Sequence, residues 1–344
     1  MDREKSKYVI KVASTYIGTV IGAGFASGRE ICIFFTNYGK ISYVSLLIST
    51  MLFMCIGSNI LVLGRKLNVN CYGDMIKDIF KGLAPFVDIY LFIVYVIISV
   101  AMFAGAGALF SKYYWLCILI TAGFAVLAII NGLDGLLNAN IIIIPMILLF
   151  DIILFVYHIE FPVNLHNCSM ISLKSLFNSL KSSLIYTSYN TILCIGVMAP
   201  LGNRIENSFI SRRGGYIGGL VIGIMLFISN YCIFAYMPHI SLREMPLLDI
   251  AKTVNPIFGW CYVLMLWGAI FTTLIANLFS ITSILERFVP SYLQNVVFIC
   301  MIIIISLFAK FGFSNIVSIF YPILGIIGLI FITYMALFPV TTRD

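Results

Sequence analysis

A glycine-rich segment interrupts the first long hydrophobic stretch of the chain and constrains the fold more than any other feature. It reads Gly22-Ala23-Gly24-Phe25-Ala26-Ser27-Gly28, and the charged pair Arg29-Glu30 follows directly. Glycine weakens a helix by about 1 kcal/mol relative to alanine, and a charge at membrane depth costs roughly 2.5–3.5 kcal/mol on insertion scales. Unwound backbone persists in a membrane only where protein or water covers it. The segment therefore predicts a broken membrane helix whose freed backbone groups bind a solute or an ion.

The composition of the chain excludes a soluble domain. Hydrophobic residues make up 61% of the 344 residues, charged residues make up 10%, and the mean hydropathy is +1.06. Apolar stretches long enough to cross a bilayer recur along the whole sequence. We therefore expect an all-α integral membrane protein with a single transmembrane domain over residues 1–344. The ten expected transmembrane helices lie near 9–35, 41–64, 84–110, 113–131, 139–158, 177–199, 215–237, 256–285, 292–309 and 315–338.

Basic residues indicate how these spans are oriented. Lysine and arginine gather in the segments that share a side of the membrane with the N-terminus, and such enrichment is typical of cytoplasmic segments. These residues are Arg3, Lys5, Lys7, Lys11, Arg65, Lys66, Lys77, Lys81, Arg204, Arg212, Arg213, Arg287 and Arg343. We expect a multi-pass protein of the cell membrane, in contact with the lipid bilayer, with both termini in the cytoplasm. The net charge of +7 then reflects topology rather than nucleic-acid binding.

The sequence lacks the signatures of several other function classes. It has no Walker A glycine loop, so we expect no use of ATP, and it has no HExxH or CxxC motif for a built metal site. Its nine cysteines are scattered without paired spacing, which argues against a disulfide framework. No nucleophile–base pair is evident. We therefore expect neither an enzyme nor a cofactor, and uphill movement of a solute would need an ion gradient or a partner.

The spacing of the spans predicts an inverted repeat. Five spans precede the predicted outside loop 159–175 and five follow it, which gives halves of approximately 8–158 and 176–338. Because five is odd, the second half must sit inverted relative to the first. Inverted repeats place the binding site at corresponding broken helices. The sixth span should therefore be broken as the first is.

A run of polar residues lies where the second break is expected. It reads Tyr186-Thr187-Ser188-Tyr189-Asn190-Thr191. A consecutive polar block covers all faces of a helix, whereas a polar stripe would recur every three or four residues. The block therefore favours an unwound segment. The alternative is a continuous helix whose hydroxyl groups bond back to its own carbonyls.

These features together resemble a known family. The segment from Gly22 to Gly28, followed by Arg29-Glu30 and by Phe34-Phe35, is similar to the YkvI-type membrane proteins. Those proteins resemble the amino acid–polyamine–organocation superfamily, which has the LeuT fold. The resemblance covers the whole chain. It implies ten helices in a 5+5 inverted repeat, discontinuous first and sixth helices, and alternating access around a site near the middle of the membrane.

The two predicted breaks supply the residues expected at a substrate. The positive end of a half-helix favours a carboxylate, so the expected solute is an amino acid or a similar small polar molecule, which Phe25 and Tyr189 are suited to cover. Arg29 and Glu30 are expected to gate access, and the alternative for them is an interfacial ion pair that reaches water. The expected substrate-binding residues are Gly22, Gly24, Phe25, Ser27, Gly28, Ser188, Tyr189 and Asn190.

The eighth span carries a candidate sodium site. In sodium-coupled transporters of the LeuT fold, a hydroxyl pair on this span joins carbonyls of the first span around the ion. Thr272 and Thr273 stand at the corresponding position, about midway through 256–285. Their hydroxyl oxygens are ligands that a hard cation prefers. The alternative is that both threonines merely bond their own backbone. We expect no metal other than this sodium ion.

Asp151 is a second candidate for ion coupling. It lies about 16 Å along a fifth helix that starts near Asn140, close to the middle of a core roughly 30 Å thick. A carboxylate at that depth is a functional candidate by default. Asp151 is expected either to bind sodium or to carry a proton. The alternative is a structural partner for Arg29 or for a polar group on another helix.

Two functions are consistent with these features. The first is a secondary active transporter, an ion-coupled symporter of an amino acid or a similar small polar solute. The second is a non-transporting ligand sensor or receptor subunit that uses the same pocket. A large signalling segment would favour the sensor, and the predicted spans leave no room for one. We therefore favour the symporter.

Overall fold

The structure is a computed structural model that describes residues 3–68, 72–131, 134–160, 172–205, 207–285 and 289–337. Every regular element in these residues is a helix, and nine of the helices there are long and apolar enough to cross a membrane. The prediction of an all-helical membrane protein is confirmed.

The α-helices are α1 (Arg3–Val20), α2 (Ala23–Ala26), α3 (Arg29–Phe34), α4 (Ser42–Lys66), α5 (Tyr72–Phe80), α6 (Ala84–Ala108), α7 (Tyr114–Asn131), α8 (Asp134–Glu160), α9 (Leu173–Asn203), α10 (Ser208–Ala235), α11 (Pro246–Val254), α12 (Pro256–Leu285), α13 (Gln294–Leu307) and α14 (Phe313–Leu337).

The first expected span is broken, as its glycines predict. Helix α1 ends at Val20, a single turn forms α2, and α3 starts at Arg29. The Gly22 amide donates to the Val20 carbonyl at 3.1 Å, which is a tight turn instead of a helical bond. Gly28 has a φ of 77°, a left-handed conformation that side chains disfavour. The predicted break at 22–28 is confirmed.

The sixth span is continuous, so the prediction that it is broken is wrong. Helix α9 runs through the whole polar block without interruption. The Thr187 hydroxyl donates to the Ser183 carbonyl at 2.9 Å, and the Asn190 amide donates to the Tyr186 carbonyl at 3.1 Å. These bonds satisfy Thr187 and Asn190 within the helix, and the block has no glycine to relax the backbone. The helical alternative is the correct one.

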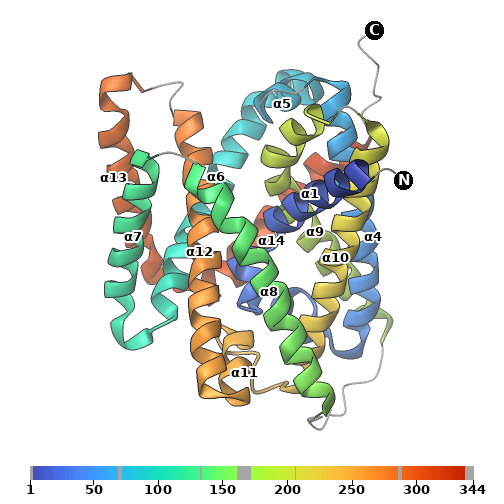
Figure 1. The fold of residues 1–344 in the computed structure, drawn as a ribbon, viewed down its shortest axis with the longest axis vertical. Coiled ribbons are helices and arrows are strands. Elements are labelled where there is room, and N and C mark those ends of the chain that lie inside the picture. Colours follow the sequence, from blue (N-terminus) through green and yellow to red (C-terminus); the bar gives the residue numbers. More distant parts are fainter. Residues whose placement is uncertain are drawn as a thin grey trace.

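The helices form one bundle with a peripheral pair (Figure 1). Helices α4 and α10 lie side by side at one edge, and α7 with α13 lies at the opposite edge. Helix α12 runs between these edges and contacts α2, α6, α8 and α11. The short helices α5 and α11 lie at opposite ends of the bundle (Figure 1). This arrangement encloses the broken first span among longer helices.

Buried polar contacts fix α1 and therefore the start of the break. The Tyr16 hydroxyl donates to the Phe53 carbonyl on α4 at 2.9 Å. One turn later the Thr19 hydroxyl donates to the Cys194 sulfur on α9 at 3.2 Å. Helix α1 is thus held against two neighbours just before it ends.

The relation between the two halves stays a prediction. The middle of the predicted outside loop 159–175 and the predicted end of the second half at 338 lie outside the described residues. The expected span 9–35 is the broken one, so it does not appear among the nine long apolar helices. The helical membrane fold is confirmed, and the inverted 5+5 arrangement of ten spans stays a prediction.

Candidate functional site

The break is supported along one side by α12. The short helix α2 packs on α12, and the Tyr262 hydroxyl donates to the Ala26 carbonyl at 2.7 Å. At the other end of α2, a Cβ atom on Gly22 would lie only 3.0 Å from the Thr273 hydroxyl oxygen. A side chain here would press against the threonine hydroxyl, which would have to move by a few tenths of an ångström. The structure therefore brings Thr273 against the break, as the sequence predicts.

The threonine pair also bonds its own helix. The Thr272 and Thr273 hydroxyls both donate to the Ala269 carbonyl, at 3.2 Å and 2.9 Å. A hydroxyl that donates one hydrogen bond keeps two lone pairs for an ion or another donor. One turn further along α12, the Asn277 side-chain nitrogen is buried and has no hydrogen-bond partner. Polar groups therefore gather at this contact, while a bound ion there stays a prediction.

The adjacent charges Arg29 and Glu30 point in different directions. The Arg29 guanidinium donates to the carbonyls of Ser241 and Arg243, in the loop between α10 and α11. The Leu247 amide, at the start of α11, donates to the Ser27 carbonyl at 3.0 Å. These bonds close α3 against the loop, while a gating role for Arg29 stays a prediction.

Glu244 in the same loop is an acidic group that interacts electrostatically with Arg29. Partial burial raises the pKa of the Glu244 carboxyl, and the positive charge of Arg29 acts in the opposite direction. The pKa remains above its usual value because desolvation is the larger influence. The loop therefore contributes both carbonyl oxygens and a carboxyl to the surroundings of Arg29.

Glu30 turns inward instead. Its side chain is 6% exposed and lies over Gly24, where a Cβ atom would collide with the carboxyl oxygen Oε1. Its charge interacts with three tyrosines, Tyr186, Tyr189 and Tyr321. The Tyr189 hydroxyl is directed at the Glu30 carboxyl as a hydrogen-bond donor, and the Tyr186 hydroxyl oxygen is buried without a hydrogen-bond partner. Glu30 is therefore a buried carboxyl whose partner is the Tyr189 hydroxyl of α9.

The predicted substrate residues are only partly assembled. Phe25 and Tyr189 are both buried, and the Ser27 hydroxyl donates to the Gly24 carbonyl at 2.9 Å. Ser188, in contrast, uses its hydroxyl on the Ile185 carbonyl of its own helix and the Gly325 carbonyl of α14. Asn190 uses its amide on its own helix. Of the three predicted residues of α9, only Tyr189 therefore faces a charged group of the broken span.

Two of the three tyrosines near Glu30 were not among the site residues predicted from the sequence. Tyr186 belongs to the polar block, and its position one turn before Tyr189 was an available signal. Tyr321 lies in an apolar stretch of α14, and no local pattern marks it. Its ring lies 5.3 Å from that of Tyr189, a contact that only the packing of α14 on α9 creates.

Asp151 does not join the threonine pair. One carboxyl oxygen accepts a hydrogen bond from the Ser229 hydroxyl at 3.0 Å, and the other is buried without a partner. Its charge also interacts with Tyr262. Asp151 therefore interacts with the tyrosine that holds the Ala26 carbonyl, whereas Thr273 contacts Gly22 at the other end of α2. The structural partner of Asp151 is Ser229 rather than Arg29.

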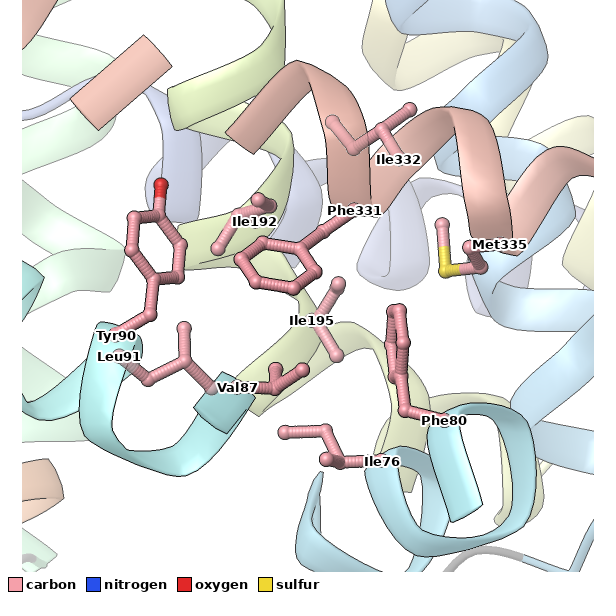
Figure 2. Close-up of a pocket in the computed structure, with 10 residues that line it drawn as sticks. All are labelled: Ile76, Phe80, Val87, Tyr90, Leu91, Ile192, Ile195, Phe331, Ile332 and Met335. Atoms are coloured by element: carbon pink, nitrogen blue, oxygen red, sulfur yellow. The ribbon is translucent and has the colours of Figure 1, made fainter. Parts of the chain in front are cut away.

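An apolar pocket lies about one turn beyond the tyrosines of α9 (Figure 2). Its one hydroxyl group, that of Tyr90, donates to the Leu324 carbonyl at 2.7 Å. A pocket for a polar solute needs a few free polar groups to orient it, so this one is not suited to that task. The lining residues are Ile76, Phe80, Val87, Tyr90, Leu91, Ile192, Ile195, Phe331, Ile332 and Met335.

Comparisons with known proteins agree with this architecture. No protein-family model matches the chain. The chain is 26% identical over 327 residues to the uncharacterized membrane protein YkvI of Bacillus subtilis (strain 168), covering 94% of this chain and 93% of YkvI.

Two solved transporter structures share the fold. A Na⁺-coupled sialic acid symporter in a substrate-bound outward-open state superimposes with a TM-score of 0.61 at 13% identity, covering 97% of this chain and 79% of the symporter. The Eremococcus coleocola manganese transporter gives a TM-score of 0.52 at 14% identity, covering 94% and 77%. These neighbours carry a sugar acid and a metal ion, so the likeness concerns the fold and not the substrate. The resemblance to YkvI-type membrane proteins is thus confirmed, and the chain shares its fold with transporters.

Proposed function

We propose that this protein is a secondary active transporter, an ion-coupled symporter that moves a small polar organic solute, an amino acid or a relative, by alternating access around the broken first span. The observation that carries the proposal is the break itself. Between Val20 and Arg29 the chain leaves the helical path while enclosed by α12 and the α10–α11 loop. Irregular backbone at this depth is costly unless it is covered, and transporters use such breaks to bind their cargo.

The contact between Gly22 and Thr273 favours sodium as the coupling ion. Sodium requires several oxygen ligands, and hydroxyl and carbonyl oxygens are suitable ones. The first intrahelical bond of α2 starts at the Gly22 carbonyl, so the Ile21 carbonyl belongs to no regular helix, and the Val20 carbonyl accepts only in the tight turn from Gly22. An ion held between these carbonyls, Thr272 and Thr273 would join α12 to the break. Sodium and solute would then strengthen each other's binding, because the coupling between two sites is reciprocal.

Asp151 supports a second version, in which a proton is the coupling ion. Its unpartnered carboxyl oxygen is buried beside Tyr262, and Tyr262 holds the Ala26 carbonyl. A change of charge on Asp151 would therefore act through Tyr262 on α2, at the end opposite to the one that Thr273 contacts. The two versions differ in their ion and in the residues that they require.

A binding and uptake experiment tests the proposal. Purified protein is screened by thermal shift against the common amino acids in sodium chloride and in potassium chloride, and stabilising solutes are then tested for uptake into proteoliposomes. We expect stabilisation that is stronger in sodium and uptake that follows an inward sodium gradient. Thr273→Val should remove the sodium effect. Thr333→Val is the matched control, because Thr333 bonds its own backbone at an exposed position of α14.

The same experiment separates the alternatives. Uptake that follows a pH gradient, ignores sodium and loses its pH dependence in Asp151→Asn would favour the proton version. Binding without uptake under any gradient would favour a receptor. A sodium effect that persists unchanged in Thr273→Val would contradict the sodium site.

A further inference from the structure

Two buried polar contacts join α8 to α10. The Asp151 carboxyl accepts a hydrogen bond from Ser229 at 3.0 Å, and two turns further along α8 the Nε2 atom of His158 lies 3.0 Å from the Tyr236 hydroxyl oxygen. Both pairs join residues that are 78 positions apart in the chain. The two helices therefore run side by side in the same direction, and the contact of His158 belongs to a regular seam between them.

The second of these contacts also reaches α11. The Tyr236 hydroxyl oxygen lies 3.3 Å from the hydroxyl oxygen of Thr253, in the last turn of α11. His158 is 1% exposed, Tyr236 is half-buried and Thr253 is exposed, so the contacts lead from a buried ring to the surface at the end of the bundle that carries α11 (Figure 1). At its other end, α11 donates from the Leu247 amide to the Ser27 carbonyl. Helix α11 is thus held at one end by the broken span and at the other by this contact.

The hydrogen atoms of the contact can be assigned from its partners. His158 Nδ1 lies 2.6 Å from the Leu154 carbonyl, which can only accept, so Nδ1 carries a hydrogen and Nε2 of the neutral ring accepts one from Tyr236. The Thr253 hydroxyl donates its own hydrogen to the Ile250 carbonyl at 2.7 Å. The contact between Tyr236 and Thr253 then has no hydrogen. Its length of 3.3 Å agrees with this, because hydroxyl hydrogen bonds usually measure about 2.5–3.0 Å.

We propose that His158 is a proton-binding site whose occupancy sets how firmly α11 is attached to α8 and α10. A proton added to Nε2 makes this atom a donor, so the Tyr236 oxygen accepts from it and the Tyr236 hydrogen turns to Thr253. The added proton stays on the ring, and no other covalent bond changes. Helix α11 gains a hydrogen bond that the neutral ring does not provide. This inference goes beyond the proposed transport function, because it requires neither a solute nor a coupling ion.

The position of His158 is suited to a positive charge. It lies in the last turn of α8, where the carbonyl end of the helix dipole favours a cation. In the charged ring both nitrogens donate, one to the Leu154 carbonyl and one to the Tyr236 oxygen, and hydrogen bonds from a charged donor are roughly twice as strong as neutral ones. Histidine is also the side chain that exchanges a proton in the physiological pH range.

Other titratable groups lie on the elements that surround His158. Asp249 pairs with Lys252 at 4.0 Å, and Tyr236 is the group bonded to the imidazole. His239 and Glu244 carry titratable groups at the same end of the bundle, so they serve as controls. The groups in the parts of these elements toward α11 are Asp151, Tyr157 and Glu160 on α8, Tyr231, Cys232 and Tyr236 on α10, His239, Arg243 and Glu244 in the loop between α10 and α11, Asp249 and Lys252 on α11, and Cys261 and Tyr262 on α12.

Hydrogen–deuterium exchange of the full chain in lipid nanodiscs, compared between about pH 8 and about pH 5, tests the site. The rates are corrected for the intrinsic effect of pH on amide exchange. We expect the amides of α11 near Thr253 to exchange more slowly at the lower pH, by roughly threefold to tenfold for one added hydrogen bond. His158→Gln removes the titrating ring and Thr253→Val removes the acceptor, so each should abolish the slowing. His239→Gln and Glu244→Gln are the matched controls and should keep it.

The variants make the result decisive in either direction. Thr253 is exposed, so Thr253→Val keeps the test available if His158→Gln does not fold. A slowing that persists in Thr253→Val, or that is lost in either control, would overturn the inference. So would a wild-type protein whose α11 shows no pH response or exchanges faster at the lower pH. A response that survives in His158→Gln and disappears in Asp151→Asn would assign the proton to Asp151 and would also overturn it. Because no solute is present, a failure of uptake leaves this result unaffected.

Discussion

The first span and helix α9 invite comparison, because both carry dense runs of small or polar residues and only one of them is broken. Around Gly28, whose φ is 77°, the chain turns between α2 and α3. Through Tyr186 and Thr187, α9 stays helical from end to end. The difference lies in the type of residue, since glycine removes side-chain atoms while a hydroxyl supplies an internal hydrogen bond.

This comparison teaches how polarity and unwinding differ inside a membrane. Hydroxyl and amide side chains satisfy themselves by bonding to carbonyls three or four residues earlier, and Thr187 and Asn190 both do so. Polar content alone therefore does not open a helix. Glycine permits both a left-handed turn and a close approach of neighbours, as at Gly22 and Thr273. The site is consequently asymmetric, with an irregular segment facing a regular helix that carries the tyrosines.

Removing the left-handed turn should give the largest effect. Gly28→Ala forces a side chain into a conformation that costs about 1–3 kcal/mol, and its Cβ would lie 2.7 Å from Leu247. We expect a clear loss of thermal stability and of folded yield in detergent. Gly123→Ala is the control, because its Cβ would meet no atom within 4 Å. Equal stability of the two variants would contradict the need for glycine at the break.

Removing the hydrogen bond that holds α2 should give the next largest effect. Tyr262→Phe keeps the ring and leaves the buried Ala26 carbonyl without its donor at 2.7 Å. A buried acceptor without a partner costs about 1–3 kcal/mol. Thermal unfolding of the purified variant checks this, and solute binding should weaken in parallel because the break loses a support. A variant as stable as the wild type would mean that the Ala26 carbonyl finds another donor.

The fold and the first break follow from the sequence for physical reasons. Span-length apolar stretches and a glycine-rich interruption are local features, and a membrane leaves few ways to satisfy them. Whether α9 is continuous, in contrast, does not follow from local sequence features alone. Ser188 can bond its own helix or another one, and in the structure it also reaches the Gly325 carbonyl of α14. Neighbours such as α14 therefore contribute, together with residue type, to whether a polar block unwinds.

The same reasoning separates the predicted site residues. The approach of Thr273 to Gly22 is expected from the resemblance to known transporters, and it is present. The inward turn of Glu30 depends on rings of α9 and α14, which no local pattern places together. The depth of Asp151 along its own helix is readable from sequence, but its register against α12 is not. That register puts it beside Tyr262 instead of Thr273.

A substitution within the polar block of α9 should have a small effect. Thr187→Val removes a hydroxyl that bonds only the Ser183 carbonyl of its own helix, and threonine and valine have similar helix propensities, so we expect a change within about 0.5 kcal/mol. Unfolding in detergent measures it. A large loss would indicate that the hydroxyl has a role beyond the helix, which would weaken the contrast with the first span.

The smallest expected effect is the coupling between the two candidate ion positions. Thr273→Val acts at the Gly22 end of α2, and Asp151→Asn acts on a carboxyl of α8 that is bonded to Ser229. The effects of groups that share no partner usually add within about 0.5 kcal/mol. The double variant should therefore show the sum of the two changes in stability. A coupling clearly larger than this would place both groups in one site and would contradict their separation.

Backbone hydrogen–deuterium exchange of the full chain in lipid nanodiscs tests the central contrast most directly. Amides in an unwound segment that lines a water-accessible site open more readily than those of a packed helix. The account predicts faster exchange over residues 21–28 than over residues 186–191, and a slowing by sodium that is confined to the first of these segments. Equal protection of the two segments, with no response to sodium, would contradict it.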